Sequence, residues 1–459
     1  MSSAHPSFRS LISAAALLVA ACSTPPAAPS AAPATDRPSS TPAPTGGPSP
    51  TASPSPSTAA TASAGDAWLI VSRAGEPALR VILDSTLEDD YELPVGVPDA
   101  TWGQILTATP GERTTRIQDL VVQPGFGGSS QEIPGRWVLP TIGLDPIPVG
   151  VTADRRTIVL VEADAAYGAA GADRAVSRFA VVDGRLGLGY EPRIIELQGA
   201  FDFDALSPDG KLLYVAQQVP GPLEARYQVR VVDTATGTIR PDVIVDKRNV
   251  DEQMAGHPID QERRADGLVM TLYRGAEYPF VHALSSVEAW AVCIDLPTRG
   301  FDDEDAADDW GIVSLGNGRS DIAINGSLGL AVEIHPSELS IRRSVDFEPS
   351  AAAPVRLAKF GHIDLGPAGR RVIAAADGAS VFAAGEGGVV RIGAAKLDVQ
   401  QRYLPATAVD SLALTPDGRT LFALTASAGR IARLDAATGE IEGWVGDGGF
   451  DRLLGAAPY

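Results

Sequence analysis

Two aspartates near the middle of the chain have the residue type and spacing of a general acid–base pair. Asp202 and Asp204 alternate with phenylalanines in the stretch FDFDALSPDG, residues 201–210. In a strand, alternation with period two places both carboxylates on one face, where they could exchange protons with a bound molecule. The alternative is structural, because short acidic side chains beside a turn often accept hydrogen bonds from its backbone amides. The structural interpretation is favoured, and the functional one stays open.

Two histidines are the next candidates. His257, in MAGHPIDQERR, precedes a turn and is the better candidate for an accessible imidazole, although a loop histidine without a role is favoured. His282 alternates in step with Phe280 and Leu284, which predicts a packed core side chain. Neither histidine belongs to an H-E-x-x-H pattern or to a Cys/His cluster, so no metal site is expected.

The remaining motifs add no catalytic group. The densest acidic run, residues 302–309, lacks the spacing of a calcium-binding loop and predicts a solvated loop, with weak calcium binding as the alternative. The sequence contains no G-x-S-x-G elbow, no G-x-x-x-x-G-K-[ST] phosphate loop and no G-x-G-x-x-G between a strand and a helix. No cofactor is therefore expected. Catalytic residues stay unassigned, with His257, Asp202 and Asp204 as weak candidates.

These residues belong to a repeated β-rich unit. The turn at residues 206–210 (LSPDG) leads into LLYVAQQ, and the turn at residues 414–418 (LTPDG) leads into TLFALTA. Each turn has a proline and a glycine where a type I turn favours them, and a β-branched or aromatic strand follows. A D-x-x-T-G turn follows in VRVVDTATGTI and IARLDAATGEI, so each unit is predicted to be a four-stranded meander. Weaker copies of the first turn are predicted at Pro98-Asp99, Ala153-Asp154, Ala265-Asp266-Gly267, Ile324-Asn325-Gly326 and Ala376-Asp377-Gly378.

The spacing of these turns, about 40 to 60 residues, suits the blades of a β-propeller with variable loops. WLIVSRAG, LRVILDS and YELPVG read as the last three strands of a blade that lacks its first strand. The tail FDRLLGAAPY could supply that strand and close the ring by pairing the N- and C-terminal strands. The predicted fold class is thus all-β, a β-propeller of four-stranded blades, eight by strand count. Seven blades is the alternative if one of the weaker turn copies belongs to a loop and does not begin a blade.

The repeated unit resembles the YVTN and WD40-like blades of bacterial β-propellers, and the resemblance covers essentially residues 66–459. FDFDALSPDG, PFVHAL and CIDLP are also similar to segments of propeller lipoproteins of actinobacterial type. The resemblance implies a site in the central funnel or over the face where loops join neighbouring blades. It implies no particular catalytic residue.

The N-terminal sequence predicts that the protein is located outside the cytoplasm. Arg9 precedes a short apolar run that ends in LVAAC, which resembles the lipobox of bacterial lipoproteins. The resemblance implies a signal peptide over residues 1–21 and attachment of a diacylglycerol, with acyl chains such as palmitate, to the sulfur of Cys22. The alternative is a plain secretory signal with an incidental cysteine. Residues 22–65 are almost only Pro, Ala, Ser, Thr and Gly, which predicts a disordered tether before the propeller domain at residues 66–459.

The charge balance narrows the function classes. The 459 residues include 57 acidic and 37 basic side chains, for a formal charge of −20, which argues against nucleic-acid binding. The expected anchor places the domain on the outer face of the bacterial cytoplasmic membrane. The leading hypothesis is a binding or scaffold module for a protein, peptide or glycan at the cell envelope, and an enzyme is less favoured. The alternative is an extracytoplasmic propeller enzyme, lactonase-like or dehydrogenase-like, with its site in the central funnel.

Overall fold

The computed structural model describes residues 66–73, 79–85, 89–123, 127–142, 147–163, 174–187, 189–219, 226–248, 254–275, 277–299, 309–316, 320–348, 369–425, 427–446 and 448–458. Residues Ala62–Tyr459 form one compact unit. The signal peptide, the tether and the lipid-attachment residue Cys22, all predicted within residues 1–65, lie outside the described residues. In the described part of the chain, no helix is long and apolar enough to cross a membrane.

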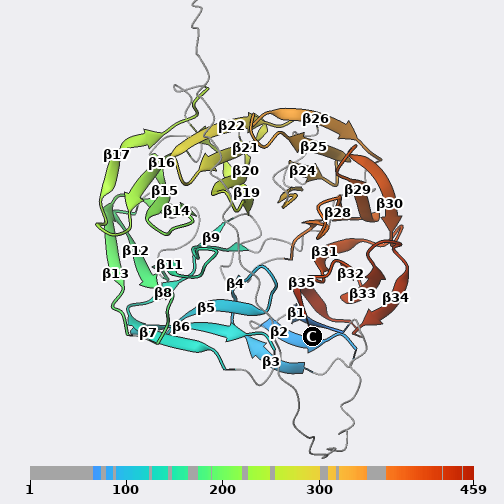
Figure 1. The fold of residues 1–459 in the computed structure, drawn as a ribbon, viewed down its shortest axis with the longest axis horizontal. Helices are drawn as coiled ribbons and strands as arrows, with labels where there is room; N and C mark the ends of the chain where they lie inside the picture. The colour runs from blue at the N-terminus through green and yellow to red at the C-terminus, as the bar shows by residue number, and fades with distance from the viewer. Residues whose placement is uncertain are drawn as a thin grey trace, which may run out of the picture. The chain divides into compact units, whose positions relative to one another are not determined.

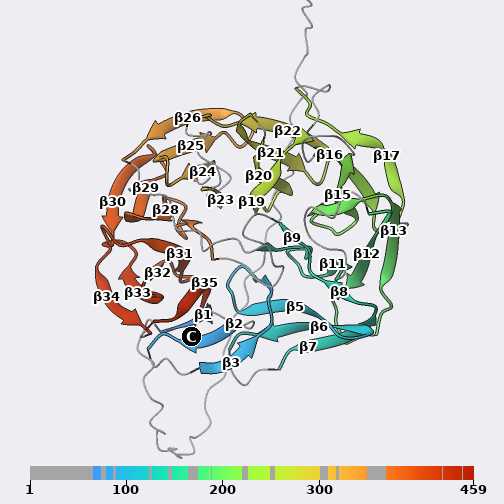
Figure 2. The ribbon, with the colours of Figure 1, turned by 180° about the vertical axis from the view of Figure 1, so that it is seen from behind.

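All regular structure in the described residues is β-sheet, arranged as eight four-stranded blades in a ring, a β-propeller. Figure 1 shows the blades following one another around the ring in chain order, and Figure 2 shows the same ring from behind. Each blade runs from an inner strand at the centre of the ring to an outer strand at the rim. The predicted fold class is confirmed, with eight blades and not seven.

The blades are numbered in chain order, and the strands of each are given from the centre outward. Blade 1 contains β35 (Phe450–Pro458), β1 (Ala67–Arg73), β2 (Leu79–Leu83) and β3 (Asp89–Leu93). Blade 2 contains β4 (Gly96–Pro98), β5 (Gln104–Pro110), β6 (Thr114–Val121) and β7 (Ser129–Pro134). Blade 3 contains β8 (Trp137–Val138), β11 (Thr157–Glu162), β12 (Val176–Asp183) and β13 (Arg193–Gln198). Blade 4 contains β14 (Phe201–Leu206), β15 (Leu212–Val219), β16 (Arg226–Asp233) and β17 (Ile239–Ile244), and the short β18 (Met254–Ala255) pairs with β16.

The second half of the ring repeats this order. Blade 5 contains β19 (His257–Arg263), β20 (Leu268–Arg274), β21 (Pro279–Ser285) and β22 (Trp290–Asp295). Blade 6 contains β23 (Trp310–Ser314), β24 (Asp321–Asn325), β25 (Leu330–Ile334) and β26 (Ile341–Asp346). Blade 7 contains β27 (Val372–Ala374), β28 (Ser380–Gly385), β29 (Gly388–Gly393) and β30 (Asp398–Tyr403). Blade 8 contains β31 (Val409–Leu414), β32 (Thr420–Thr425), β33 (Arg430–Asp435) and β34 (Ile441–Val445).

The ring closes within blade 1. The first strand of the domain, β1, pairs antiparallel with the last, β35, from Ala67 opposite Pro458 to Arg73 opposite Phe450. The tail FDRLLGAAPY therefore supplies the missing inner strand, as the sequence predicts. Pairing the two ends leaves no unpaired sheet edge between the first and the last blade.

Apolar clusters hold neighbouring blades together. Eight such clusters occur among the described residues, one for each pair of neighbours around the ring. The closing pair is an example, because Phe422 of blade 8 packs with Leu69 and Leu453 of blade 1. Each fully buried side chain of this size stabilises the fold by about 1.5–3 kcal/mol. Because each cluster joins only two neighbouring blades, a longer chain forms more blades and does not need a larger single core.

The predicted turns behave as expected in the two clearest copies. Asp209 accepts from the backbone amide of Lys211 at 3.1 Å, and the equivalent Asp417 accepts from the amide of Arg419 at 3.1 Å. The prediction at Ile324-Asn325-Gly326 is wrong. Ile324 and Asn325 are the last residues of β24, and Gly326 begins the turn into β25, whereas the first turn of blade 6 lies between β23 and β24. A short polar turn fits either connection, so the sequence does not distinguish them.

Blade 3 has an interrupted inner strand that the sequence did not predict. Its two pieces are β8, which pairs with β11, and Val151, which forms a single bridge to Ile158. Between them the chain leaves the blade through β9 (Thr141–Ile142) and β10 (Ile147–Pro148), which pair with each other. Figure 1 shows β9 toward the centre of the ring, and it contacts β19 of blade 5. The chain between the two pieces of this strand therefore extends from blade 3 to the inner strand of blade 5, beyond the neighbouring blade 4.

Candidate functional site

The inner strand of blade 4 contains a bulge at one of the two candidate aspartates. Phe203 pairs with Val215 and Ala205 pairs with Tyr214, so Asp204 has no residue opposite it in the ladder. A bulge re-aims the side chain of its extra residue. Strict alternation along FDFD is broken at this point, and the inference that Asp202 and Asp204 share one face does not hold.

Asp204 is a buried carboxyl group without a hydrogen-bond partner on one oxygen. The residue is 3% exposed, and its Oδ2 is buried with no partner among the described residues. Burial disfavours the ionised form and raises the pKa of Asp204 to about 7, an effect that the positive charge of Arg263 partly offsets. Near neutral pH, this group therefore exists in both protonation states.

Two side chains of β19 extend from blade 5 toward blades 4 and 3. Gln261 donates through Nε2 to the carbonyl oxygen of Asp204 at 3.1 Å and to Oγ1 of Thr271 at 2.9 Å. Arg263 donates through Nη1 to the carbonyl oxygen of Val151 in blade 3, at 3.1 Å. Its Nη2 is buried without a partner among the described residues, and burial lowers the pKa of Arg263 to about 10. Arg263 as a whole is half-buried, and only its Nη2 atom is both buried and without a hydrogen-bond acceptor in the described part of the chain.

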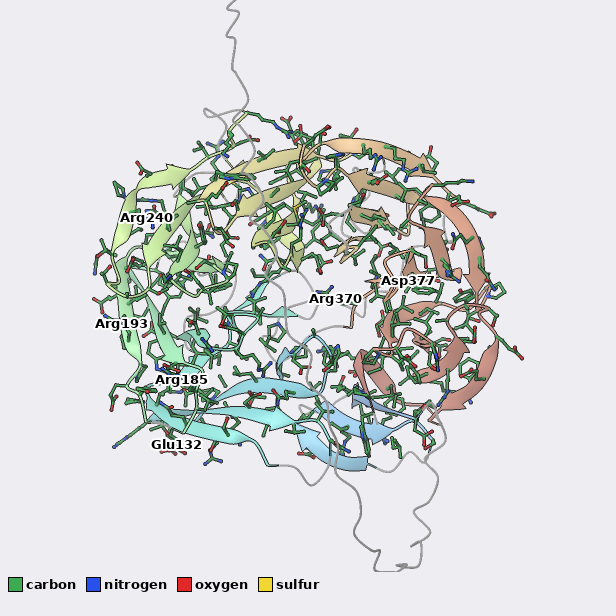
Figure 3. All side chains as sticks on the ribbon, viewed as in Figure 1. Glu132, Arg185, Arg193, Arg240, Arg370 and Asp377 are labelled. Atoms are coloured by element: carbon green, nitrogen blue, oxygen red, sulfur yellow. The ribbon has the colours of Figure 1, made fainter. Side chains whose placement is uncertain are left out.

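Glu262, which lies between Gln261 and Arg263 on β19, pairs with a residue of blade 7 and not with blades 3 and 4. Glu262 accepts from Nη1 of Arg370, which precedes β27 in blade 7, at 2.8 Å. Burial raises the pKa of Glu262, and the carboxylate of Glu262 raises the pKa of Arg370. Figure 3 shows Arg370 at the centre of the ring, whereas Arg193 and Arg240 lie at its rim. We call Asp204, Gln261, Glu262, Arg263 and Arg370 the axial cluster.

Of the three residues that the sequence suggests for catalysis, only Asp204 belongs to the axial cluster. Asp202 accepts from Nη2 of Arg174 at 2.6 Å and from Nε2 of Gln218 at 2.8 Å, and its side chain is 46% exposed. His257 is an exposed residue that begins β19, and no hydrogen bond or ion pair among the described residues joins it to either aspartate. Among the described residues, neither aspartate accepts from the amides of the adjacent turn, so the favoured capping interpretation is wrong. Asp209 accepts from the amide of Lys211, and the hydroxyl of Ser207 accepts from the amide of Leu212.

The sequence contains a signal for the residues of the axial cluster that no motif identifies. The residues before a first turn are apolar in FDFDALSPDG and in VDSLALTPDG, but polar in DQERRADG of blade 5. Four charged or amide residues in succession at the end of an inner strand are unusual, because both faces of that strand pack against neighbouring blades. They are Asp260 and the three residues of β19 in the axial cluster, Gln261, Glu262 and Arg263.

A polar row crosses the same face of blade 5. Gln261, Thr271, His282 and Cys293 stand opposite one another on the four successive strands. His282 is fully buried, as predicted, and its Nδ1 lies 3.8 Å from the sulfur of Cys293. Burial lowers the pKa of His282 to about 4, so its imidazole is neutral at physiological pH. Cys293 is partly exposed.

The acidic run lies almost wholly outside the described residues. Its last member, Asp309, is buried and pairs with Arg371 at 2.9 Å, so this residue is not part of a solvated loop. In the described part of the chain, no group of three or more His, Cys, Asp or Glu side chains is placed to hold a metal ion.

The fold and the axial cluster together define a β-propeller whose centre carries oppositely charged groups that range from buried to partly exposed. No protein-family model matches the sequence, and no curated protein matches it. Among solved structures, the dihydro-heme d1 dehydrogenase NirN, in complex with DHE, is similar with a TM-score of 0.51 and 14% identity. That likeness covers 85% of this chain and 74% of that chain.

Apo AztD from Citrobacter koseri is similar to the same degree. Its TM-score is 0.51 at 13% identity, and the likeness covers 85% of this chain and 98% of that chain. The periplasmic gluconolactonase PpgL from Pseudomonas aeruginosa has a TM-score of 0.42 and 17% identity, over 77% of this chain and 99% of that chain. At such identities the likeness to NirN and AztD shows the β-propeller fold, and the site must be argued from its own residues.

Proposed function

We propose that this protein is a lipid-anchored, extracytoplasmic binding module for a protein, peptide or glycan at the cell envelope, and that the axial cluster is its ligand site. The observation that carries the proposal is the pair of unsatisfied groups on Asp204 and Arg263. Buried charged groups without partners lower stability, so they are better explained by binding than by folding. Arg370 supports this role, because its side chain is 41% exposed at the centre of the ring.

A photo-crosslinking amino acid at position 370 tests the binding role. Cells that carry this substitution are irradiated, and the adducts are identified by mass spectrometry. The matched control carries the same amino acid at position 193, an exposed arginine at the rim. A specific adduct at position 370 and none at position 193 is expected. Equal labelling at both positions, or none at position 370, contradicts the proposal.

The anchor is tested separately. Cys22→Ser should move the protein from the membrane fraction to the soluble fraction and abolish incorporation of a palmitate analogue. Both effects are expected because Cys22 supplies the sulfur that the lipobox-like sequence marks for acylation. A Cys22→Ser protein that stays acylated and in the membrane fraction rules out this anchor. The residues of the propeller are unchanged in this variant, so ligand binding should persist.

One observation favours a second function, an extracytoplasmic propeller enzyme of lactonase-like or dehydrogenase-like type. Asp204 has an unsatisfied oxygen and a pKa of about 7, and such a group is suited to general acid–base catalysis at neutral pH. A panel of lactones and alcohols with added electron acceptors tests this version. Turnover that is lost in Asp204→Asn but kept in Asp202→Asn is expected of an enzyme. The absence of turnover across the panel leaves the binding role.

A further inference from the structure

Two buried polar atoms of the axial cluster are unsatisfied. They are Oδ2 of Asp204 in blade 4 and Nη2 of Arg263 in blade 5. Gln261 joins the two residues, because it donates to the carbonyl oxygen of Asp204 at 3.1 Å and accepts from Nε of Arg263 at 3.5 Å. Buried polar atoms in folded proteins are nearly always hydrogen-bonded. A complementary pair of exceptions in one cluster therefore indicates the place of a ligand.

The charges of the cluster favour an anion. Arg370 is paired with Glu262 at 2.8 Å, whereas Arg263 forms no ion pair within the part of the chain that the structure describes. The charges of Glu262 and Asp204 attract this guanidinium without forming an ion pair with it among the described residues. An anion beside Nη2 would add a closer electrostatic attraction and the hydrogen bond that this atom lacks. Asp204 can add a second donor when its carboxyl group is protonated. Nη2 of Arg263 and the protonated carboxyl group of Asp204 are two hydrogen-bond donors, and a carboxylate has two oxygens that can accept from them.

We propose that Asp204 and Arg263 bind a carboxylate group carried by the peptide, protein or glycan ligand, an inference that rests on the proposed ligand-binding role of the axial cluster. Nη2 of Arg263 donates to one carboxylate oxygen. The protonated carboxyl group of Asp204 donates to the other oxygen through a charge-assisted hydrogen bond. Gln261 positions both residues through its side-chain amide and does not need to contact the ligand.

Binding of the carboxylate should depend on pH through the protonation of Asp204, whose carboxyl group would contact the ligand, whereas the raised pKa of Glu262 belongs to a group that is paired with Arg370. Its pKa of about 7 means that the donor form predominates at pH 6 and the anionic form, which repels a carboxylate, at pH 8. Arg263 keeps its charge over this range because its pKa is about 10, and His282 stays neutral because its pKa is about 4. Burial raises the pKa of the three tyrosines that interact electrostatically with Asp204, which are Tyr214, Tyr227 and Tyr273. The protonated fraction of Asp204, and with it the affinity, should fall about tenfold from pH 6 to pH 8.

Calorimetric titration of the purified full-length protein with acetate tests the inference. Titrations at pH 6 and pH 8 use the same chloride concentration, and acetamide serves as the neutral counterpart of acetate. Saturable binding of acetate at pH 6, about tenfold weaker at pH 8, and no binding of acetamide are expected. Equal affinity for acetamide, or acetate binding that does not change with pH, overturns the inference.

Two variants separate the roles of the residues. Arg263→Gln removes the cation and should weaken acetate binding at least tenfold at pH 6. Asp204→Asn keeps a neutral donor, so it should bind acetate equally at pH 6 and pH 8. Asp202→Asn is the matched control on the same strand and should behave as the wild type. If Arg263→Gln does not fold, the pH profile of Asp204→Asn still decides the matter.

Acetate binding and crosslinking at position 370 together distinguish failure of the carboxylate site from failure of the proposed binding function. An adduct at position 370 in cells, together with a full-length protein that binds no acetate at pH 6, would reject the carboxylate site and keep the binding module. The absence of both signals would reject both proposals. Acetate binding with the expected pH profile supports the carboxylate site whatever the crosslinking experiment recovers.

Discussion

Arg370 of blade 7 donates to Glu262 of blade 5 across 2.8 Å, although blade 6 stands between these two blades. The inner strand of blade 6 permits this approach because it has a glycine at the crossing point. A Cβ atom on Gly311 would lie 2.7 Å from Cγ2 of Val372 in blade 7 and 3.8 Å from Oδ2 of Asp260 in blade 5. Blades 5 and 7 thus converge over a position that has no side chain.

Gly311→Val should destabilise the propeller by about 1–3 kcal/mol, because the new side chain would push β27 away from β19. Denaturant unfolding followed by circular dichroism measures the change. The control is Gly443→Ala in β34, where a Cβ atom would meet nothing within 4 Å. Its effect should be below about 1 kcal/mol. A wild-type midpoint for Gly311→Val would show that the blades do not converge as described.

The pair itself should show energetic coupling. We expect a double-mutant cycle of Glu262→Gln and Arg370→Gln to give a coupling free energy of about 1–2 kcal/mol, since Glu262 is mostly buried whereas Arg370 is partly screened by solvent. The same cycle on Arg116 and Glu132, an exposed pair within blade 2, should give less than about 0.5 kcal/mol. Equal coupling in the two cycles would mean that the axial pair is no stronger than a surface pair.

Asp204 should make the wild-type protein less stable as the pH rises. Its pKa is about 7 in the folded chain and 3.8 in the unfolded chain, so the folded state binds the extra proton between these values. Stability therefore falls across this window, with a slope of up to about 1.4 kcal/mol per pH unit from this group. In Asp204→Asn, the free energy of unfolding relative to the wild type should rise with pH from 4 to 7. A pH-independent difference would argue against the buried, protonated carboxyl group.

His282 should act in the opposite direction. Its pKa is about 4 in the folded chain and 6.5 in the unfolded chain, so the unfolded state binds the extra proton and stability is lost as the pH falls through this window. The two slopes oppose each other between pH 4 and 6.5, and their sum in the wild type is close to level. His282→Gln should remove the imidazole contribution and leave a stability that falls with rising pH relative to the wild type. Thermal unfolding at half-unit pH intervals measures both profiles.

Much of the fold follows from local sequence patterns. The LSPDG and LTPDG turns and the missing first strand predict the blades, and FDRLL near the C-terminus repeats the pattern of FDFDA, which marks an inner strand. His282 is predicted to be buried because its neighbours alternate with it. These inferences depend on residues close together in the chain, where periodicity and turn chemistry are informative.

The axial cluster was less predictable because it depends on contacts between distant blades. The bulge at Asp204 is a departure from the regular strand that alternation cannot reveal. Glu262 and Arg370 are 108 positions apart, and a third blade stands between them, with a glycine between the neighbouring residues Asp260 and Val372. The excursion through β9 and β10 interrupts a strand whose remaining pieces are each short. The bulge, the ion pair and the excursion depend on how the blades pack around the ring, so they produce no periodic pattern in the sequence.

Removal of β35 tests how far the ring depends on its closure. A chain that ends at residue 449 lacks the inner strand of blade 1 and exposes the edge of β1 along with Phe422 and Leu69 of the closing cluster. We expect it to aggregate, because an exposed strand edge beside apolar surface pairs with other chains. Size-exclusion chromatography with light scattering measures this. A chain that lacks only residue 459 is the control, and a monomeric, folded 449-residue chain would show that closure is dispensable.

The closing pair also determines where the propeller would bear mechanical load. Any tension transmitted through residues 1–65 enters the domain at the start of β1, which is hydrogen-bonded to β2 along one edge and to β35 along the other. The ladder bonds are perpendicular to the strands, so a pull along β1 shears both ladders and distributes the force over many bonds at once. The joint between the two ends of the domain should therefore resist shear, and the residues of the axial cluster, which belong to blades 4, 5 and 7, lie outside that joint.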